Sequence, residues 1–187
     1  SSTMETKKWV SDQAHSELQF KVKHLMITNV TGDFTDFNVE TESESPDFQD
    51  AKIKVTIKTD SVKTGPADRD KHLKSADFFD TEKYPEIKFV STRFRKVNED
   101  GGYVLEGNLT IKDVTTPVSL NVEYGGSVKD PWGNVKSAFS VQGKISRKDW
   151  GLNYNAALET GGVVVSDEVR ILAEVQMTVV VEEPAEV

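Results

Sequence analysis

Apolar and polar side chains alternate along most of this 187-residue chain. In HSELQFKVKH, residues 15–24, the side chains of Leu18, Phe20 and Val22 fall on one face of an extended chain, and charged or amide side chains fall on the other. A period of two is typical of β-strands that bury one face. The same period recurs in residues 51–59, 85–94, 103–111, 117–124, 135–145 and 169–179. With a short strand around Trp9, the pattern predicts eight or nine strands.

The segments between these runs predict how the strands are joined. Turn-forming sequences at residues 98–102, 125–134 and 159–162 are typical of β-hairpins, so we expect sequential strands to pair antiparallel. An open sheet of such long strands would expose its edges and a wide apolar face, whereas closure removes both. The sequence therefore predicts an all-β fold, an eight-stranded antiparallel barrel that forms one domain over residues 1–187.

Residues 65–85 interrupt the alternation and form the longest connection without a strand pattern. Cationic and apolar side chains recur there at helical spacing, which predicts a short helical insertion around residues 66–79. Long connections in compact domains are often lids or binding loops. The residues of this insertion that we expect to contact a ligand are Arg69, His72, Leu73, Phe78 and Phe79.

His24 ends the first apolar row. Its parity predicts that it faces the same interior as Val22, while Lys21 and Lys23 face water. A buried imidazole without a hydrogen-bond partner costs about 1 to 3 kcal/mol, so we expect one to be present. Backbone atoms, the Ser91 hydroxyl, water or the polar part of a ligand could each supply that partner.

Composition and charge narrow the classes of function. The chain has 31 acidic and 23 basic side chains and a net charge of −8, which repels a phosphate backbone, so nucleic acid is not an expected partner. No apolar run is long enough for a transmembrane helix, and we expect no stable membrane insertion. The absence of cysteine excludes disulfides and thiolate metal sites. No leader is visible, which favours the cytoplasm, whereas a removed leader would place the protein in the periplasm.

Catalytic and metal-binding motifs are not found. The three histidines, His15, His24 and His72, are not spaced as a pair of metal ligands, and no serine lies in a G-x-S-x-G turn. We therefore expect no metal, no cofactor and no catalytic residue.

The interior of a closed barrel is the remaining place for a function. Small residues such as Ala51, Gly107 and Gly143 fall among the inward positions, and small side chains leave space that suits an apolar ligand. A barrel whose core is completely filled by side chains is the alternative.

Four separate segments, in order and across nearly the whole chain, resemble the YceI-like family of lipocalin-like proteins. They are DQAHSELQFKVKHLMITNVTGDF (12–34), DRDKHLKSADFFDTEKYPEIKFVST (68–92), GNLTIKDVTTPVSL (107–120) and SRKDWGL (146–152). The resemblance implies an extended eight-stranded barrel with a deep apolar channel. It further implies non-catalytic binding, transport or storage of one long-chain lipid, such as a polyprenyl phosphate, a respiratory quinone or a fatty amide.

Carried onto this sequence, the resemblance implies a tail-binding channel with its mouth at residues 65–85. Leu73, Phe78 and Phe79 would form the rim, and Arg69, His72 and His24 would meet the polar head of the lipid. The inward residues along the tail would be Phe20, Val22, Phe34, Val55, Ile57, Phe89, Leu109, Ile111, Val122, Phe139 and Val141.

Two other classes of function stay open at this point. An enzyme that modifies a lipid would need a polar cluster deep in the channel, and the sequence offers only His24 and scattered serines. A protein-interaction barrel would have a filled core instead of a channel. Either kind of barrel is compatible with a homodimer.

Overall fold

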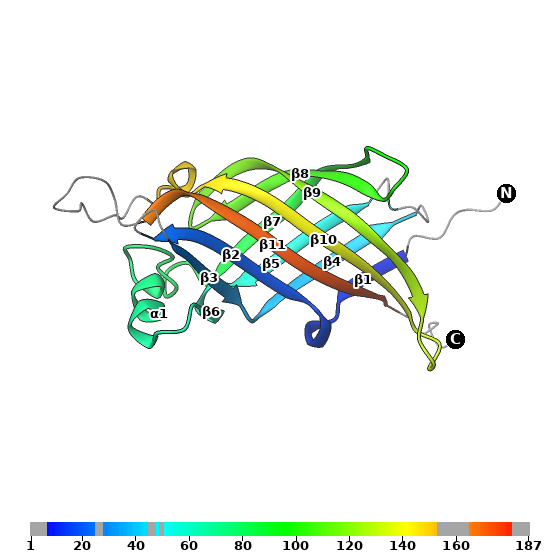
Figure 1. Cartoon of the computed structure of the whole chain (residues 1–187), viewed down its shortest axis with the longest axis horizontal. Coiled ribbons are helices and arrows are strands. Elements are labelled where there is room, and N and C mark those ends of the chain that lie inside the picture. Colours follow the sequence, from blue (N-terminus) through cyan, green and yellow to red (C-terminus); the bar gives the residue numbers. More distant parts are fainter. Residues whose placement is uncertain (1–6, 25–27, 45–47, 49–50, 153–164, 181–187) are drawn as a thin grey trace, which may run out of the picture.

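The computed structural model describes residues 7–24, 28–44, 48, 51–152 and 165–180, in which β-strands predominate (Figure 1). These residues form eleven strands and one α-helix, α1 (Ala67–Lys74). The strands are β1 (Lys7–Ser11), β2 (Glu17–His24), β3 (Thr28–Phe34), β4 (Phe37–Ser43), β5 (Lys52–Lys58), β6 (Val62–Lys63), β7 (Glu86–Lys96), β8 (Gly102–Ile111), β9 (Val114–Lys129), β10 (Val135–Ser146) and β11 (Val165–Val179). No helix in this part of the chain is long and apolar enough to cross a membrane.

All the strands belong to one antiparallel sheet that closes on itself. The ring runs β1, β4, β5, β7, β8, β9, β10 and β11, and β11 pairs back onto β1 with Trp9 opposite Val179. The predicted all-β fold and eight-stranded antiparallel barrel are therefore confirmed.

Breaks in three of the long strands explain why eleven strands make an eight-stranded barrel. β1 and β2 lie end to end on the same edge of β11, β3 and β4 continue one another, and so do β5 and β6. At the first break, the Ser16 hydroxyl accepts a hydrogen bond from the Gln176 backbone at 3.1 Å, and the Asp12 backbone donates to the Gln176 carbonyl at 2.7 Å. These bonds pair the backbone N–H and C=O groups of Gln176 in β11 at the point where no strand lies opposite.

The ring has a gap between β6 and β7. β6 pairs with β3, Phe34 opposite Val62, and no ladder joins β6 to β7 although both strands are described. The helical insertion expected around residues 66–79 is present as α1 followed by turns, and α1 contacts β6 at this end of the barrel (Figure 1). The insertion therefore lies beside β6 at the end of the barrel where β6 and β7 do not pair.

The alternation of side chains is confirmed by which residues face the interior. Odd-numbered residues of 51–57 and even-numbered residues of 118–122 are buried or half-buried and face the enclosed space. The same holds for odd-numbered residues of 105–111 and even-numbered residues of 18–22, apart from Gly107, which is buried beneath a ring. A shift of one residue in strand pairing would turn each apolar row toward water, so the hydrophobic pattern fixes the register.

The expectation that interior glycines leave open space is wrong at two positions. The Phe89 ring lies over Gly107, where an added Cβ would come within 2.5 Å of the ring. The Leu120 side chain lies over Gly143, where an added Cβ would come within 2.2 Å of Leu120 Cδ2. Cross-strand neighbours fill these places, so the open volume lies elsewhere along the barrel.

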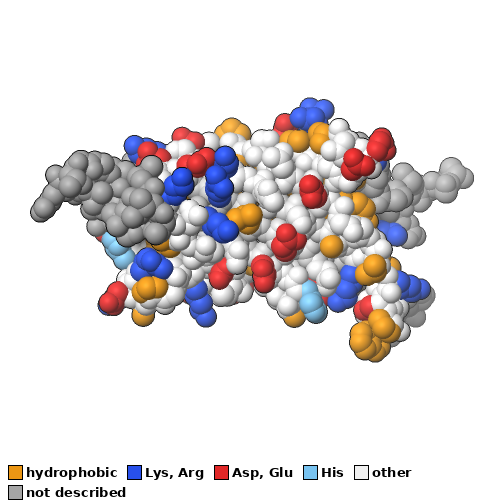
Figure 2. Space-filling model, viewed as in Figure 1, with side chains coloured by type: hydrophobic (Ala, Val, Ile, Leu, Met, Phe, Trp, Pro, Cys, Tyr) orange, Lys and Arg blue, Asp and Glu red, His pale blue; other side chains and the backbone are white. Residues whose placement is uncertain are grey.

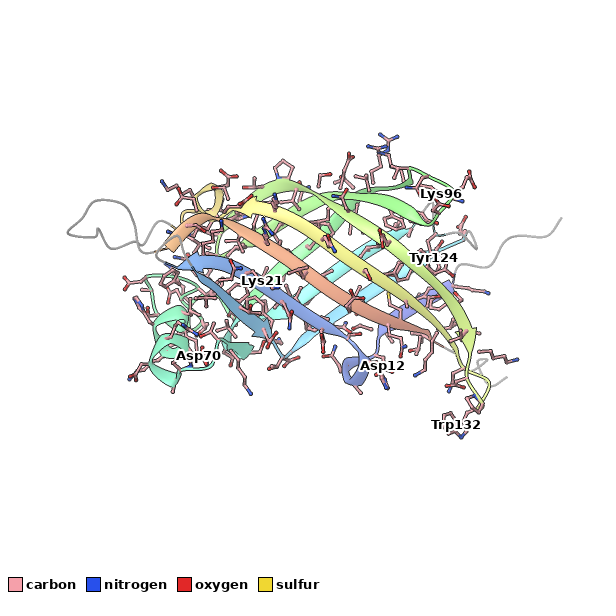
Figure 3. All side chains as sticks on the ribbon, in the orientation of Figure 1. Asp12, Lys21, Asp70, Lys96, Tyr124 and Trp132 are labelled. Carbon is pink, nitrogen blue, oxygen red and sulfur yellow. The ribbon has the colours of Figure 1, made fainter. Side chains whose placement is uncertain are left out.

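Aromatic side chains close the end of the barrel that is remote from α1. Phe48 lies 5.2 Å from both Trp9 and Phe139, and Tyr124 stacks on Phe139 at 5.1 Å between ring centroids. Tyr124 is labelled at this end in Figure 3. Such ring contacts are each worth about 0.5 to 1.5 kcal/mol beyond area burial.

We predict that Gly107→Ala lowers the free energy of unfolding by about 1 to 3 kcal/mol. The new methyl group would lie 2.5 Å from both the Phe89 ring and the Val90 carbonyl oxygen, and the backbone oxygen cannot move aside freely. Gly125→Ala is the matched control, since its methyl group would meet Ala138 at an ordinary 3.5 Å. Urea unfolding of both variants measures the difference, and equal stability of the two would contradict the close contact described here.

Candidate functional site: an enclosed apolar channel

The barrel encloses two adjoining cavities. The outer cavity has a volume of about 410 Å³ and lies beside α1, and the inner cavity has about 140 Å³ and reaches the aromatic cluster at the closed end. Four apolar residues line both, namely Leu18, Ile57, Leu109 and Ile171. They mark the junction, so the two cavities are successive parts of one channel along the barrel.

The outer cavity lies between the strands and the insertion. From the insertion, Leu73, Phe78 and Phe79 line it, and the Phe79 ring meets Phe34 edge-on at 5.7 Å. Phe34 in turn lies 5.5 Å from Phe20 across the sheet. This row of aromatic rings ties the insertion to the wall formed by β2 and β3.

Hydrogen bonds to Thr64 attach α1 to the barrel. Asp70 accepts from the Thr64 backbone at 2.7 Å and from its hydroxyl at 2.5 Å, while Arg69 donates to the Thr64 hydroxyl and carbonyl at 2.8 and 2.7 Å. The hydrogen bond from the Thr64 hydroxyl is the main reason that the pKa of Asp70 is lowered. No residue of α1 is fully buried, so these polar contacts fix its position together with the half-buried Leu73, which packs against the core.

Polar side chains of the outer cavity lie largely at its rim. Arg69 is exposed, and His72, which is half-buried, lies 2.8 Å from Asp77 through its Nε2 atom. The His72 ring also meets Phe78 edge-on at 5.1 Å. The rim therefore offers cationic and hydrogen-bonding groups next to an apolar interior.

Arg147 is a buried exception to this arrangement. Its side chain is 5% exposed, and it donates to the carbonyls of Ser166 at 3.0 Å and Leu152 at 2.7 Å. Burial lowers the pKa of its guanidinium, and Asp167, 3.8 Å away, partly offsets this effect. The side chain therefore joins the backbone at Leu152 to the backbone at Ser166, beside the outer cavity.

The inner cavity is almost wholly apolar. Thr41 is the one polar residue among the described residues that line it, and its hydroxyl lies 3.3 Å from the Met177 sulfur. In the described part of the chain, no three His, Asp or Glu side chains gather closely enough to hold a metal ion. The channel can therefore hold hydrocarbon, and the rim can meet a polar group.

The structure brings most of the residues predicted from the sequence into this channel. Those lining the outer cavity are Phe20, Val22, Phe34, Ile57, Arg69, His72, Leu73, Phe78, Phe79, Leu109 and Ile111. Those lining the inner cavity are Val55, Ile57, Phe89, Leu109, Val122, Phe139 and Val141.

Two predicted residues stand apart from this set. Ser91 lines neither cavity, and its hydroxyl accepts a hydrogen bond from the Ile53 backbone at 2.8 Å where the ladder between β5 and β7 ends. The side chain of His24 lies outside the described residues, although its backbone ends β2 opposite Thr28.

Several lining residues were not among those expected to contact the ligand. The alternation placed Leu18, Ile87 and Ile171 on inward faces, and all three line the outer cavity. Phe48 lies in a polar segment, and Arg147 follows a strand as a charged residue, so no hydrophobic pattern marked either one. The position of Phe48 depends on rings from segments distant in the chain, and that of Arg147 on carbonyls 5 and 19 residues away.

Comparison with known proteins gives consistent results. A family model described as the YceI-like domain matches residues 9–177. A UPF0312 protein of Staphylococcus aureus is 39% identical over 90% of this chain and 95% of its own length. The Campylobacter jejuni YceI protein is 33% identical, with a TM-score of 0.72 over 88% of this chain and 91% of that one.

Two more distant structures share the fold. Burkholderia cenocepacia BcnA is 22% identical with a TM-score of 0.75, over 89% of this chain and 98% of that one. A polyisoprenoid binding domain of Saccharophagus degradans is 18% identical with a TM-score of 0.62, over 92% of this chain and 98% of that one.

We predict that Arg147→Met lowers the free energy of unfolding by about 2 to 4 kcal/mol, because the carbonyls of Leu152 and Ser166 lose a buried donor. Lys148→Met is the control, since the Lys148 side chain is 58% exposed and should change stability by at most about 0.5 kcal/mol. Urea unfolding compares the two variants. Equal losses would show that Arg147 does not join these segments.

Proposed function

The chain belongs to the YceI-like family, and on this basis we propose that it binds one long-chain lipid with the tail inside the channel. The lipid would be an isoprenoid or a related chain, such as a polyprenyl phosphate, an isoprenoid quinone or a fatty amide. The Saccharophagus degradans neighbour is described as a polyisoprenoid binding domain, which supports this class of ligand. Carriage or storage of that lipid is the proposed role.

The enclosed apolar channel is the observation that carries this proposal. Its outer and inner parts adjoin at four apolar side chains, and the inner part ends against aromatic rings. A long narrow space with one polar rim fits a molecule with a long apolar tail and a small head. A compact ligand would fill only the outer cavity.

We infer a binding role rather than a catalytic one. Catalysis needs a nucleophile, acid or base held at the reacting atoms. The described polar residues of the outer cavity lie at the rim or, like Arg147, donate to backbone carbonyls, and Thr41 in the inner cavity contacts a sulfur atom. This arrangement favours holding a lipid over changing it.

The proposed position of the head group is the rim beside α1. Arg69 and His72 would meet a phosphate, a quinone carbonyl or an amide there in exchange for part of their hydrogen bonds to Thr64 and Asp77. The prediction that His24 also meets the head is part of the same proposal, since β2 ends at this side of the barrel (Figure 1). The tail would then run past the junction residues toward Phe139.

The apolar surface of the channel sets how affinity should depend on tail length. Moving one five-carbon isoprene unit out of water is worth about 3 to 4 kcal/mol gross. Ordering of a large ligand leaves only about 0.3 kcal/mol per heavy atom, or about 1.5 kcal/mol per unit. Affinity should therefore rise about tenfold per unit until the channel is full.

We predict that Val141→Trp shortens the longest tail that binds with full affinity. Val141 lines the inner cavity opposite Val122 and Ala173, so an indole there would occupy much of the 140 Å³. Lipids with short tails should bind with the same affinity as to the unchanged protein. Beyond the new length limit, each further isoprene unit should add no affinity. Titration with a series of isoprenoids of increasing length measures this limit.

The control for this experiment is Val90→Trp. Val90 is 48% exposed and lines neither cavity, so the same residue change there should leave the length dependence intact. An affinity that does not depend on tail length in the unchanged protein would defeat the proposed function. An identical length limit in the protein with Val141→Trp would show that the tail does not reach the inner cavity.

A further inference from the structure

The hairpin between β9 and β10 carries an exposed tryptophan at its tip. The ladder continues from the barrel to the pair Lys129 and Val135, and Trp132 lies in the turn between them. Figure 3 shows the Trp132 side chain at the end of this projection, away from the barrel wall. Its side chain is 83% exposed, whereas Trp9 and Trp150 are 6% and 2% exposed.

The turn that presents Trp132 is held in one conformation. Asp130 Oδ1 accepts from the backbone of Trp132 and of Asn134, each at 2.9 Å, and the Asp130 backbone donates to the Asn134 carbonyl at 2.8 Å. Gly133 has a φ of 89°, which a residue with a side chain rarely adopts. The exposure of Trp132 is therefore part of a defined turn.

The side chains around Trp132 are apolar and cationic. Val128 is 66% exposed and Val135 is 37% exposed, and Lys129 follows Val128 in the chain and lies directly opposite Val135 across the ribbon. The space-filling view shows hydrophobic and basic side chains together on this projection, at the lower right of the molecule (Figure 2). Exposed tryptophan with flanking lysine and valine is a combination that suits the boundary between lipid head groups and acyl chains.

Among the residues that the structure describes, the charges near this tip balance. Lys129 stands beside Asp130, which is engaged by the turn, and Lys136, one residue beyond Val135, pairs with Asp12 at 3.1 Å. His15, from the neighbouring turn, also lies 3.0 Å from Asp12. The molecule as a whole has a net charge of −8, so strongly anionic membranes would repel it. A zwitterionic surface is the better match.

The shape of the tip favours a lipid surface over a protein. A stable protein interface buries about 800 Å² on each partner, whereas a two-stranded tip is a narrow projection. A deformable bilayer surface can accept such a wedge. In Figure 1 the hairpin and α1 project below the barrel at its two ends.

We propose that Trp132 and the neighbouring valines form a membrane-contact site that inserts reversibly into the head-group region of a zwitterionic bilayer. The exposed indole, the fixed turn and the flanking lysine are the observations behind this site. The site does not depend on which lipid binds in the channel. Contact at this tip would bring the barrel to the surface on which long-chain lipids reside.

Tryptophan fluorescence with phosphatidylcholine vesicles tests this proposal directly. Because Trp9 and Trp150 are buried, a change in emission and in quenching by acrylamide reports on Trp132. We expect vesicles to shift the emission to shorter wavelength and to protect it from acrylamide. In vesicle co-sedimentation, Trp132→Ala should bind at least about tenfold more weakly, because it removes the largest apolar group of the tip.

Val97→Ala is the matched control for this assay, since Val97 is 47% exposed but lies on the loop between β7 and β8, and it should bind vesicles as the unchanged protein does. Unchanged emission with vesicles, or equal sedimentation of Trp132→Ala, would overturn the proposal. A blue shift that depends only on protein concentration would also overturn it and assign the tip to a second copy of this chain. None of these readouts involves the channel, so they are separate from the test of the proposed function.

Discussion

β11 closes the sheet into a barrel, and the interior, the register and the channel all follow from that closure. β11 pairs with β10 along one edge and with both β1 and β2 along the other, which turns one apolar face of a long sheet into an enclosed interior. Because every inward row is set by period-two alternation, the register that closes the ring also decides which side chains meet inside. Without the pairing of Trp9 with Val179, the apolar rows would face water and two strand edges would be unpaired.

Closure creates an interior, and the sizes of the side chains decide how much of it is filled. Aromatic rings fill the end near Phe48, and Phe89 and Leu120 cover the glycines opposite them, while the region beside α1 keeps about 410 Å³ open. Open apolar volume forfeits contacts and lowers stability relative to a filled core. A tail that enters this volume would restore those contacts, so binding and stability are linked in the proposed function.

The fold and most of the residues that line the channel could be predicted from the sequence because alternation is a local signal. Val55, Leu109 and Val141 were found from parity alone and lie on the channel. The strand breaks, such as the one bridged by Ser16, were not predicted, since they depend on which backbone groups of β11 lack a facing strand. Phe48 was missed because its burial comes from rings of segments distant in the chain, and Arg147 because a charged side chain that bonds to the carbonyls of Leu152 and Ser166 leaves no hydrophobic pattern. The covering of Gly107 by Phe89 likewise requires the register between β7 and β8.

The proposed function requires that the closed barrel hold one lipid tail in its channel. Native mass spectrometry of the protein purified from a bacterial host, followed by organic extraction, detects such a lipid. We expect a complex that exceeds the mass of the chain by one long-chain lipid, and recovery of that lipid in the organic phase. A bare chain as purified, which also fails to take up an added polyprenyl phosphate, isoprenoid quinone or fatty amide, would show that the channel does not hold a lipid tail.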